Sequence, residues 1–327
     1  MDQKSDWSLF HARLHQNLRH NQLLPKQSKI LIAVSGGQDS LCLAKLILDL
    51  QNKWEWQIAI AHCDHNWSTD AGIAEHVEKI ATNWRVPFYL KKANQLKETE
   101  AAARKWRYQA LVEIAQEQNF DYLVTGHTKS DRAETFLYNL IRGAGSNGLS
   151  SLNQKRQLTS KITLIRPILD FTRSETLTFC QQFDLSIWLD QANSNLNYAR
   201  NRIRQQLIPN LQVNFNPQIE KSLVQTSELL RADSEYLEIE AAKILDQVRT
   251  KDQRLDRLQL RELHLAIQRR VIRQFLPEII SKSPNFEQIE AVRGLIVAPN
   301  RSRTSTLVRD IFAEVDGDWI IFSSLKP

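Results

Sequence analysis

Cysteine is scarce in this chain, and its spacing is not that of a metal site. The 327 residues include three cysteines, Cys42, Cys63 and Cys180, and no CxxC pair. Three isolated cysteines cannot make a disulfide framework. The sequence therefore predicts no disulfide scaffold and no structural zinc or iron-sulfur centre.

Long apolar runs are absent as well. No segment approaches the roughly 20 apolar residues that a membrane-spanning helix needs, and the start of the chain lacks the apolar centre of a secretory signal. We therefore expect a cytoplasmic protein with no membrane partner. Hydrophobic residues make up 42% and charged residues 24% of the chain, which is typical of a globular protein with a full core.

The net charge of +6 is modestly basic, which is compatible with a phosphate-rich partner but also common in proteins without one. The distribution is more informative, because basic residues gather near 104–107, 200–204 and 251–273. We expect these stretches to face a polyanion.

Short apolar runs alternate with helical patterns along the first part of the chain. Strands are predicted at 29–34, 57–62, 87–92 and 121–127, and helices directly after the first strand and at 71–84, 98–118 and 131–141. This alternation predicts an α/β fold with a doubly wound, mostly parallel sheet. Ligands of such sheets bind at the carboxyl ends of the strands.

The length exceeds the usual single-domain size of about 100–200 residues, which favours two domains. We expect an α/β domain at 1–215, closed by a Gly/Ser-rich loop, a short strand at 161–167 and a helix at 173–183. A sustained helical pattern predicts a connecting helix at 216–248. The remainder, 249–327, combines a helix at 261–275 with β-like ends, which indicates a small α+β domain.

A glycine pair lies between the first strand and the first helix. The loop reads Ser35, Gly36, Gly37, Gln38, Asp39 and Ser40. Glycines there let backbone amides and the helix N-terminus face an anion, and both serine hydroxyls can donate to phosphate. Asp39 would repel phosphate unless a cation such as Mg²⁺ lay between them. A tight turn with Ser40 as a helix cap is the alternative.

The loop is neither a Walker P-loop nor a dinucleotide fingerprint, because it lacks Gly-Lys-Ser/Thr and GxGxxG. It resembles the SGGxDS loop of the PP-loop ATP pyrophosphatase family, which has the adenine nucleotide alpha hydrolase-like fold. That resemblance implies that the loop holds the pyrophosphate part of ATP. It also implies that a substrate oxygen attacks the α-phosphate to give an adenylated intermediate.

Further motifs narrow the resemblance to the tRNA(Ile)-lysidine synthetase family. They are AHCDHNW at 61–67, EAAARKWRY at 100–108, TGHTKSDRAET at 125–135, RGAGSNGL at 142–149, Arg166-Pro167, WLD at 188–190, NSN at 193–195 and RNxxR at 200–204. The second is similar to E-A-x-A-R-x-x-R-Y and the third to TGHxxDDQxET. Ser130 and Arg132 depart from the third pattern, and Ser130 removes one carboxylate, so we leave it out of the catalytic set.

The resemblance implies roles for single residues. Asp39, Asp131, Glu134, Arg107 and Arg204 are expected to be catalytic, with Asp39 also the expected Mg²⁺ ligand, and His65 and His127 are expected to join the loop at the nucleotide. The expected substrate-binding residues are Arg104, Arg142, Asn195, Arg200 and Asn201. Each has a structural alternative: a histidine filling a strand end, arginines on a solvated helix face, acids capping a helix, or a loop that buttresses the fold.

Members of this family join free L-lysine to C2 of the wobble cytidine in the CAU anticodon of tRNA(Ile), consuming ATP with Mg²⁺. By resemblance, the C-terminal domain binds tRNA, a last domain of longer members is lacking, and some members form homodimers. One alternative is a PP-loop tRNA thiolase, although that chemistry usually needs paired reactive cysteines. NAD or GMP synthetases fit less well after residue 98, and a non-catalytic, ATP-dependent tRNA-binding protein is a third interpretation.

Overall fold

The computed structural model describes residues 7–67, 70–150, 152–188 and 195–324. Leu189, Asp190, Asn193 and Ser194 of the motifs quoted above lie outside these residues. Contacts between Cα atoms divide the chain into an N-terminal unit, 1–228, and a C-terminal unit, 229–327. The division falls within helix α10 (Ile219–Val248).

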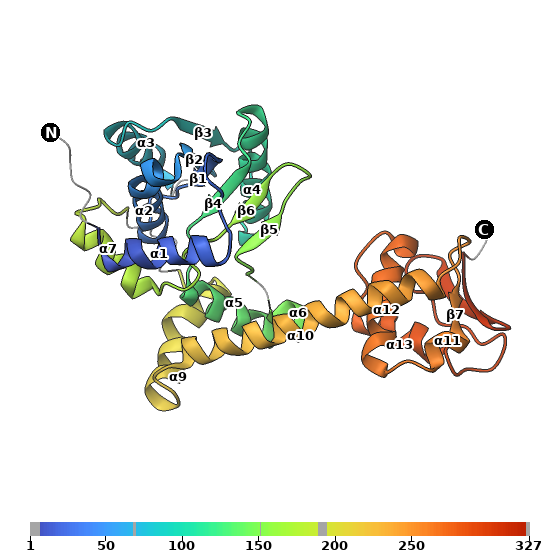
Figure 1. The fold of residues 1–327 in the computed structure, drawn as a ribbon. Coiled ribbons are helices and arrows are strands. Elements are labelled where there is room, and N and C mark those ends of the chain that lie inside the picture. Colours follow the sequence, from blue (N-terminus) through green and yellow to red (C-terminus); the bar gives the residue numbers. More distant parts are fainter. Residues whose placement is uncertain (1–6, 68–69, 151, 189–194, 325–327) are drawn as a thin grey trace. The chain divides into compact units, whose positions relative to one another are not determined.

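A six-stranded sheet organises the N-terminal unit, with strand order β3-β2-β1-β4-β6-β5 (Figure 1). The strands are β1 (Lys29–Ala33), β2 (Gln57–Asp64), β3 (Phe88–Lys92), β4 (Tyr122–Thr125), β5 (Lys155–Gln157) and β6 (Thr163–Ile165). All neighbours pair in parallel except β5, which runs antiparallel to β6. The predicted α/β class with a mostly parallel sheet is confirmed.

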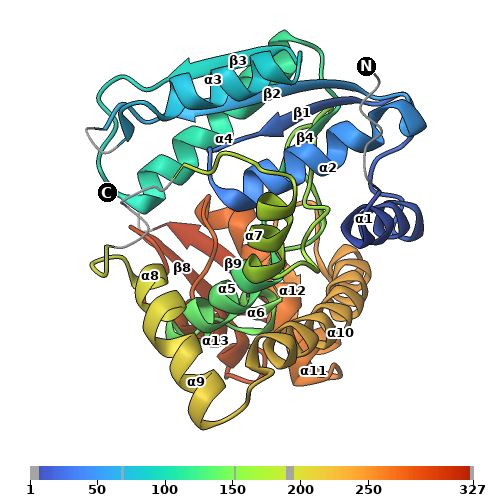
Figure 2. The same cartoon turned by 90° about the vertical axis from the view of Figure 1, so that its left-hand side faces the viewer.

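Alternating side chains of the central strands face two different helical layers. Ile30 and Ile32 of β1 pack in one core, whereas Leu31 between them packs in the other. The first core is covered by α1 (Leu9–His20), α2 (Gln38–Trp54), α3 (Ile73–Asn83) and α7 (Arg173–Gln182), and the second by α4 (Glu100–Glu117). Helices α2 and α7 lie side by side (Figure 2). Because both faces are covered, the sheet is doubly wound, as predicted.

A third group of helices comes after strand β4 in the chain and has its own small apolar cluster. Helix α5 (Lys129–Ile141) packs Ala133 and Leu137 against Ile203 and Ile208, and the first turns of α10 join this cluster. The short helices α6 (Ser146–Leu149), α8 (Ala199–Arg202) and α9 (Ile208–Asn214) complete the group, with a π-helical turn at Ile203–Leu207 between α8 and α9.

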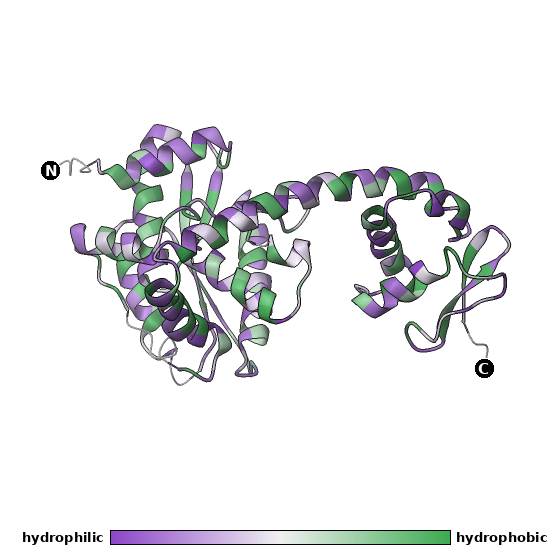
Figure 3. Cartoon of the chain, turned by 90° about the horizontal axis from the view of Figure 1, so that it is seen from below, coloured by the Kyte–Doolittle hydropathy of each residue, from purple (hydrophilic) through white to green (hydrophobic). Residues whose placement is uncertain are grey.

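The C-terminal unit has its own core and its own sheet. Strands β7 (Leu255–Asp256), β8 (Ile311–Asp316) and β9 (Trp319–Ser324) form an antiparallel sheet of order β7-β9-β8, and the helices are α11 (Arg257–Arg261), α12 (Leu265–Ile280) and α13 (Phe286–Gly294). Along α10, hydrophobic and hydrophilic residues alternate, as on a helix that buries part of its surface (Figure 3). No helix in the described ranges is long and apolar enough to cross a bilayer.

Candidate active site

The loop between β1 and α2 is held by its own serines. Ser40 Oγ donates to the Gly37 carbonyl at 2.9 Å and accepts the Ser35 N–H at 3.2 Å. Gly36 adopts φ +83°, a conformation that costs an L side chain energy, and its carbonyl accepts the Trp188 N–H at 3.0 Å. The loop therefore has one defined shape in front of the positive end of α2, which is suited to an anion.

Gly126, after β4, lies against the start of α2. A Cβ atom at Gly126 would be 2.7 Å from the Asp39 carbonyl oxygen and 3.0 Å from Ser40 Cα. Backbone atoms at such distances cannot give way as a flexible side chain would. The glycine therefore permits the β4–α5 loop and the β1–α2 loop to meet at the carboxyl ends of neighbouring strands.

The Asp39 carboxylate is held from α7. Thr176 Oγ1 donates to Asp39 Oδ1 at 2.5 Å, and Arg173 Nε lies 3.7 Å from Oδ2. Burial raises the pKa of Asp39, Arg173 opposes this, and the nearby charge of Asp131 adds to it. A buried carboxylate beside a second carboxylate is an arrangement that a divalent cation would stabilise.

Arg204 joins the two acids at the start of α5. Its Nε and Nη2 donate to both Glu134 oxygens at 2.6 and 2.9 Å, and Nη2 lies 3.5 Å from Asp131 Oδ1. The other Asp131 oxygen accepts the Thr128 N–H at 2.8 Å as part of a capping box. Asp131 therefore caps α5 with one oxygen and faces Arg204 with the other.

Burial and charge act differently on these acids. Burial raises the pKa of Glu134, and Arg204 opposes this shift. Burial also acts upward on Asp131, but the hydrogen bonds from Thr128 and the charge of Arg204 outweigh burial and lower the pKa of Asp131. Arg204 projects from the π-helical turn, a feature that is frequent at functional sites because it redirects side chains.

A cluster of cations lies beside His127. Burial lowers the pKa of His127 to about 3; Asp131 opposes this shift, whereas the nearby arginines add to it, so the imidazole is neutral. Its Nδ1 is 2.9 Å from Thr125 Oγ1. Burial likewise lowers the pKa of Arg107, with Arg104 and Arg200 acting in the same direction. No described carboxylate lies within 4.0 Å of the Arg107 guanidinium. Such a group of arginines is suited to an anion.

His65 is ordered by its neighbours. Its Nδ1 is 3.1 Å from Asp70 Oδ2, and its ring stacks on Trp67 with centroids 4.9 Å apart. Its Nε2 is buried without a hydrogen-bond partner among the described atoms. Burial, followed by Arg107, lowers the pKa of His65. A neutral imidazole with one unsatisfied nitrogen is available to a ligand.

The other expected substrate residues form a separate group around Tyr138. Arg142 Nη1 donates to Tyr138 Oη at 2.7 Å, and the Arg142 and Arg200 guanidinium carbons lie 5.2 and 5.8 Å from its ring centre. Asn201 Nδ2 donates to the Asn195 carbonyl at 2.9 Å, which closes the loop before α8. These contacts order the loop beside α5, and they involve none of the β1–α2 loop residues.

Sequence reasoning missed several residues at the site. Thr176 holds Asp39, whereas its neighbour Glu175 pairs with Arg13 at 2.6 Å. Glu220 was also missed, and it accepts a hydrogen bond from Ser130 Oγ at 3.0 Å. The spacing Arg173-x-x-Thr176 places both side chains on one helix face, but nothing in the sequence indicates Asp39 as their partner.

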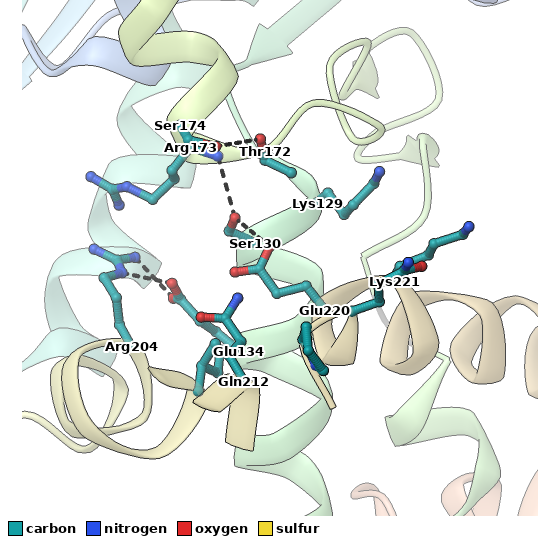
Figure 4. Close-up of a pocket in the computed structure, with 13 residues that line it drawn as sticks. Lys129, Ser130, Glu134, Thr172, Arg173, Ser174, Arg204, Gln212, Glu220 and Lys221 are labelled. Atoms are coloured by element: carbon teal, nitrogen blue, oxygen red, sulfur yellow. Dashed lines mark hydrogen bonds and ion pairs between the residues drawn. The ribbon is translucent and has the colours of Figure 1, made fainter. Parts of the chain in front are cut away.

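A cavity of about 570 Å³ adjoins the acids. Its walls include Lys129, Ser130, Glu134, Arg173, Arg204, Glu220 and Lys221, drawn in Figure 4. Side chains of both charges line it, and its size lies in the usual range for small-molecule sites. The cavity can hold a small zwitterion.

The sheet order, the glycine loop and the acids at the strand ends define a nucleotide-binding α/β enzyme. The family model of the PP-loop domain matches residues 9–211, so this chain is an enzyme of the ATP-binding PP-loop class. It is 51% identical to a tRNA(Ile)-lysidine synthase from Nostoc sp., over 96% of this chain and 97% of the relative. It is 52% identical to one from Synechocystis sp., with the same coverage of both chains. The chain belongs to the tRNA(Ile)-lysidine synthase family.

A solved structure shares the fold at low sequence identity. A U34-tRNA thiolase from Methanococcus maripaludis superposes with a TM-score of 0.58 at 17% identity, over 68% of this chain and 78% of that one. The three cysteines here are buried, and burial raises the pKa of Cys63 and Cys180 to about 12. Buried thiols of this kind are unreactive, which argues against the thiolase alternative.

Proposed function

We propose that this chain ligates free L-lysine to C2 of the wobble cytidine of tRNA(Ile) bearing a CAU anticodon, with cleavage of ATP to AMP and pyrophosphate. The observation that carries the proposal is the similarity to relatives named tRNA(Ile)-lysidine synthase, which are 51% and 52% identical over 96% of this chain. The placement of Asp39, Asp131 and Arg204 at one end of the sheet supports it.

The first step is adenylation of the base. The C2 oxygen of cytidine attacks the α-phosphate of ATP, and pyrophosphate leaves. Backbone amides of the loop from Ser35 to Ser40 and the positive end of α2 would bind the departing phosphates. Arg104 and Arg107 would neutralise further phosphate charge, and His65 and His127 would contact the nucleotide as neutral imidazoles. The cytidine must leave its stack to reach this site.

The residues present fit Mg²⁺ at Asp39. Mg²⁺ in phosphoryl-transfer sites is usually held by one or two carboxylates together with phosphate oxygens and water. The buried Asp39 carboxylate, with its raised pKa and Asp131 nearby, matches that donor set. When bound, the ion would offset phosphate charge as the α-phosphate bond is broken. Thr176 and Arg173 would keep the Asp39 oxygens in position.

The second step replaces the adenylated oxygen with lysine. The neutral ε-amine attacks C2, AMP leaves, and the nitrogen loses a proton as the C–N bond forms. Asp131 is the proposed acceptor, because it is ionised and only one of its two oxygens is used to cap α5, while the other faces Arg204. Glu134 is engaged by Arg204 on both oxygens, so we assign Glu134 to positioning Arg204 at the reacting nucleotide.

The remaining substrate contacts involve the RNA. We infer that Arg142, Arg200, Asn195 and Asn201 bind nucleotides beside the wobble base, and that the C-terminal unit binds tRNA through its phosphates. The affinity of binding that depends on phosphate contacts falls steeply as the salt concentration rises. We also infer cytoplasmic action, where tRNA, ATP and lysine occur together, and a homodimer as in some family members, which sedimentation analysis would test.

Lysine incorporation tests the proposal directly. Purified protein is incubated with ATP, Mg²⁺, radiolabelled lysine and CAU-bearing tRNA(Ile), or with the same tRNA carrying another wobble base. Label should enter the tRNA only when both ATP and the wobble cytidine are present. Pyrophosphate release that depends on tRNA but brings no lysine into it would refute the proposal.

A further inference from the structure

We propose that Glu220 binds the α-ammonium group of the free lysine substrate and that Ser130 orients the carboxylate of Glu220. This inference rests on the proposed function. Glu220 lies in the first turn of α10, and Ser130 lies in the first turn of α5. The hydrogen bond from Ser130 Oγ to Glu220 Oε2, at 3.0 Å, brings the Glu220 carboxylate to the wall of the cavity.

The Glu220 carboxylate lacks a cationic partner. It is half-buried, and no described Lys or Arg side chain lies within 4.0 Å of it. The other acid of the cavity wall, Glu134, is fully engaged by Arg204. A partly buried carboxylate that meets only a hydroxyl is stabilised by an arriving cation. Among the cavity acids, Glu220 is therefore the one available to an ammonium group.

The same cavity offers cations for a carboxylate. Lys129, Arg173 and Lys221 line it together with Glu220. In the view of Figure 4, Lys129 and Lys221 lie on the opposite side of the Glu220 carboxylate from Arg173 and Arg204. An amino acid carries an ammonium and a carboxylate on one carbon. The Glu220 carboxylate can meet the ammonium group and the surrounding cations can meet the carboxylate. The cavity therefore suits an amino acid better than a simple anion.

The cavity also adjoins the reaction centre. Arg204 and Arg173, which form part of its wall, lie 3.5 Å from Asp131 and 3.7 Å from Asp39. Ser130 and Asp131 are consecutive on α5, so their side chains project about 100° apart from the same turn. A lysine with its α-ammonium at Glu220 can therefore extend its side chain towards Asp131, where the ε-amine must react.

A purely structural role for Glu220 makes a different prediction. An acid in the first turn of a helix interacts with the helix dipole, and its bond to Ser130 braces α10 against α5. Loss of such a brace would lower stability and leave the recognition of lysine unchanged. Glu228 supplies a matched control, because it also braces α10 to α5, through Arg132 Nη2 at 2.6 Å, and does not line the cavity.

The experiment compares wild type, Glu220→Gln, Ser130→Ala and Glu228→Gln in lysine incorporation. Glutamine keeps the shape of Glu220 and accepts the Ser130 hydrogen bond, but it has no charge. We expect Glu220→Gln to raise KM for lysine at least about tenfold, the effect of losing one charged contact. Ser130→Ala should raise it less, and Glu228→Gln should leave it unchanged. KM for ATP and tRNA-dependent pyrophosphate release should be the same in all four proteins.

A lysine analogue makes the test specific. 6-Aminohexanoate keeps the carboxylate and the terminal amine of lysine but has no α-ammonium. Wild type should bind this analogue at least about tenfold more weakly than it binds lysine. In Glu220→Gln the difference in affinity between the two compounds should disappear. Equal discrimination in wild type and Glu220→Gln, or equal binding of the analogue and lysine by wild type, would overturn the inference. Failure of wild type to incorporate lysine would instead overturn the proposed function.

Discussion

Arg204 donates to both carboxylate oxygens of Glu134, which is 2% exposed. The pair links the π-helical turn to the first turns of α5, and the same guanidinium reaches Asp131. A bidentate contact fixes the plane and the distance of the guanidinium, which a lysine could not reproduce. The position of Arg204 is therefore determined by the buried acid beneath it.

Removal of Arg204 should lower both stability and activity. Arg204→Ala leaves the buried Glu134 without its cation, so the free energy of unfolding should fall by about 3 kcal/mol. Lysine incorporation should fall more than about 100-fold. The double variant Arg204→Met with Glu134→Gln should regain most of the stability in urea denaturation, without regaining activity. Recovery of activity in the double variant would exclude a direct role for Arg204.

Asp39→Asn should separate activity from stability. Burial raises the pKa of Asp39, so the ionised carboxylate is disfavoured in the folded protein and an uncharged amide should not destabilise it. We expect tRNA-dependent pyrophosphate release to fall at least about 100-fold, while the thermal midpoint stays equal or rises. Thr176→Val should cause a smaller loss that higher Mg²⁺ partly restores. Normal pyrophosphate release by Asp39→Asn would exclude its assignment to phosphate and Mg²⁺.

Gly126→Ala tests the contact between the two strand-end loops. The new methyl group would lie 2.7 Å from the Asp39 carbonyl oxygen, so the backbone must shift. We expect a loss of about 1–3 kcal/mol in stability and weaker ATP binding. Gly294→Ala is the control, because no described atom outside its own helix turn and its chain neighbours lies within 4 Å of the corresponding methyl position. Nucleotide titration and thermal unfolding of both variants would distinguish a local clash from a general effect of alanine.

The sheet was predictable because its strands are apolar and its helices follow at regular intervals. Helix α1 was not predicted, because its buried face consists of His11, Leu14 and Leu18, and the histidine interrupts the apolar spacing. Strand β5 was not predicted either, since its three residues are polar and exposed. Both elements depend on tertiary contacts: His11 bonds to Asp49, and β5 pairs along the edge of β6.

The site was predictable where its residues are close in sequence. Asp131 and Glu134 are three residues apart on one helix, a spacing that brings both carboxylates to one side, and Arg204 contacts both. Contacts between distant segments leave no such spacing. Thr176 reaches Asp39 across 137 positions, and Glu220 reaches Ser130 across 90. Those pairs became visible only when the chain was folded.

Asp49 should contribute to stability in a pH-dependent way. Burial acts to raise its pKa, but His11 and Lys45, at 3.0 and 2.6 Å, outweigh burial and lower it below the ordinary value of 3.8. A lowered pKa means that the contribution is fully present above 3.8 and is lost as the pH falls through the folded value. Asp49→Asn should therefore destabilise the protein at pH 7, and the difference should shrink only as the pH falls below 3.8. Urea denaturation of both proteins across this range measures it, and a difference that does not change with pH would contradict the ion-pair explanation.

Substitution of Arg107 should reduce activity without reducing stability, whereas substitution of a structural arginine should reduce stability. Burial and the neighbouring arginines lower its pKa, and no described carboxylate lies within 4.0 Å to compensate its charge. Its substitution should therefore relieve repulsion in the free enzyme. We expect Arg107→Gln to unfold at an equal or higher temperature, by up to about 1 kcal/mol of added stability, and to lose at least about tenfold in pyrophosphate release.

Arg13 provides the comparison for Arg107. Its guanidinium pairs with Asp170 at 2.7 Å and Glu175 at 2.6 Å, so Arg13→Gln should lower stability, with a smaller effect on KM for ATP. If Arg107→Gln instead destabilises the free enzyme as Arg13→Gln does, then Arg107 serves the fold. If it is stable and its KM for ATP or tRNA rises, then the enzyme keeps an uncompensated cation that only a bound phosphate stabilises.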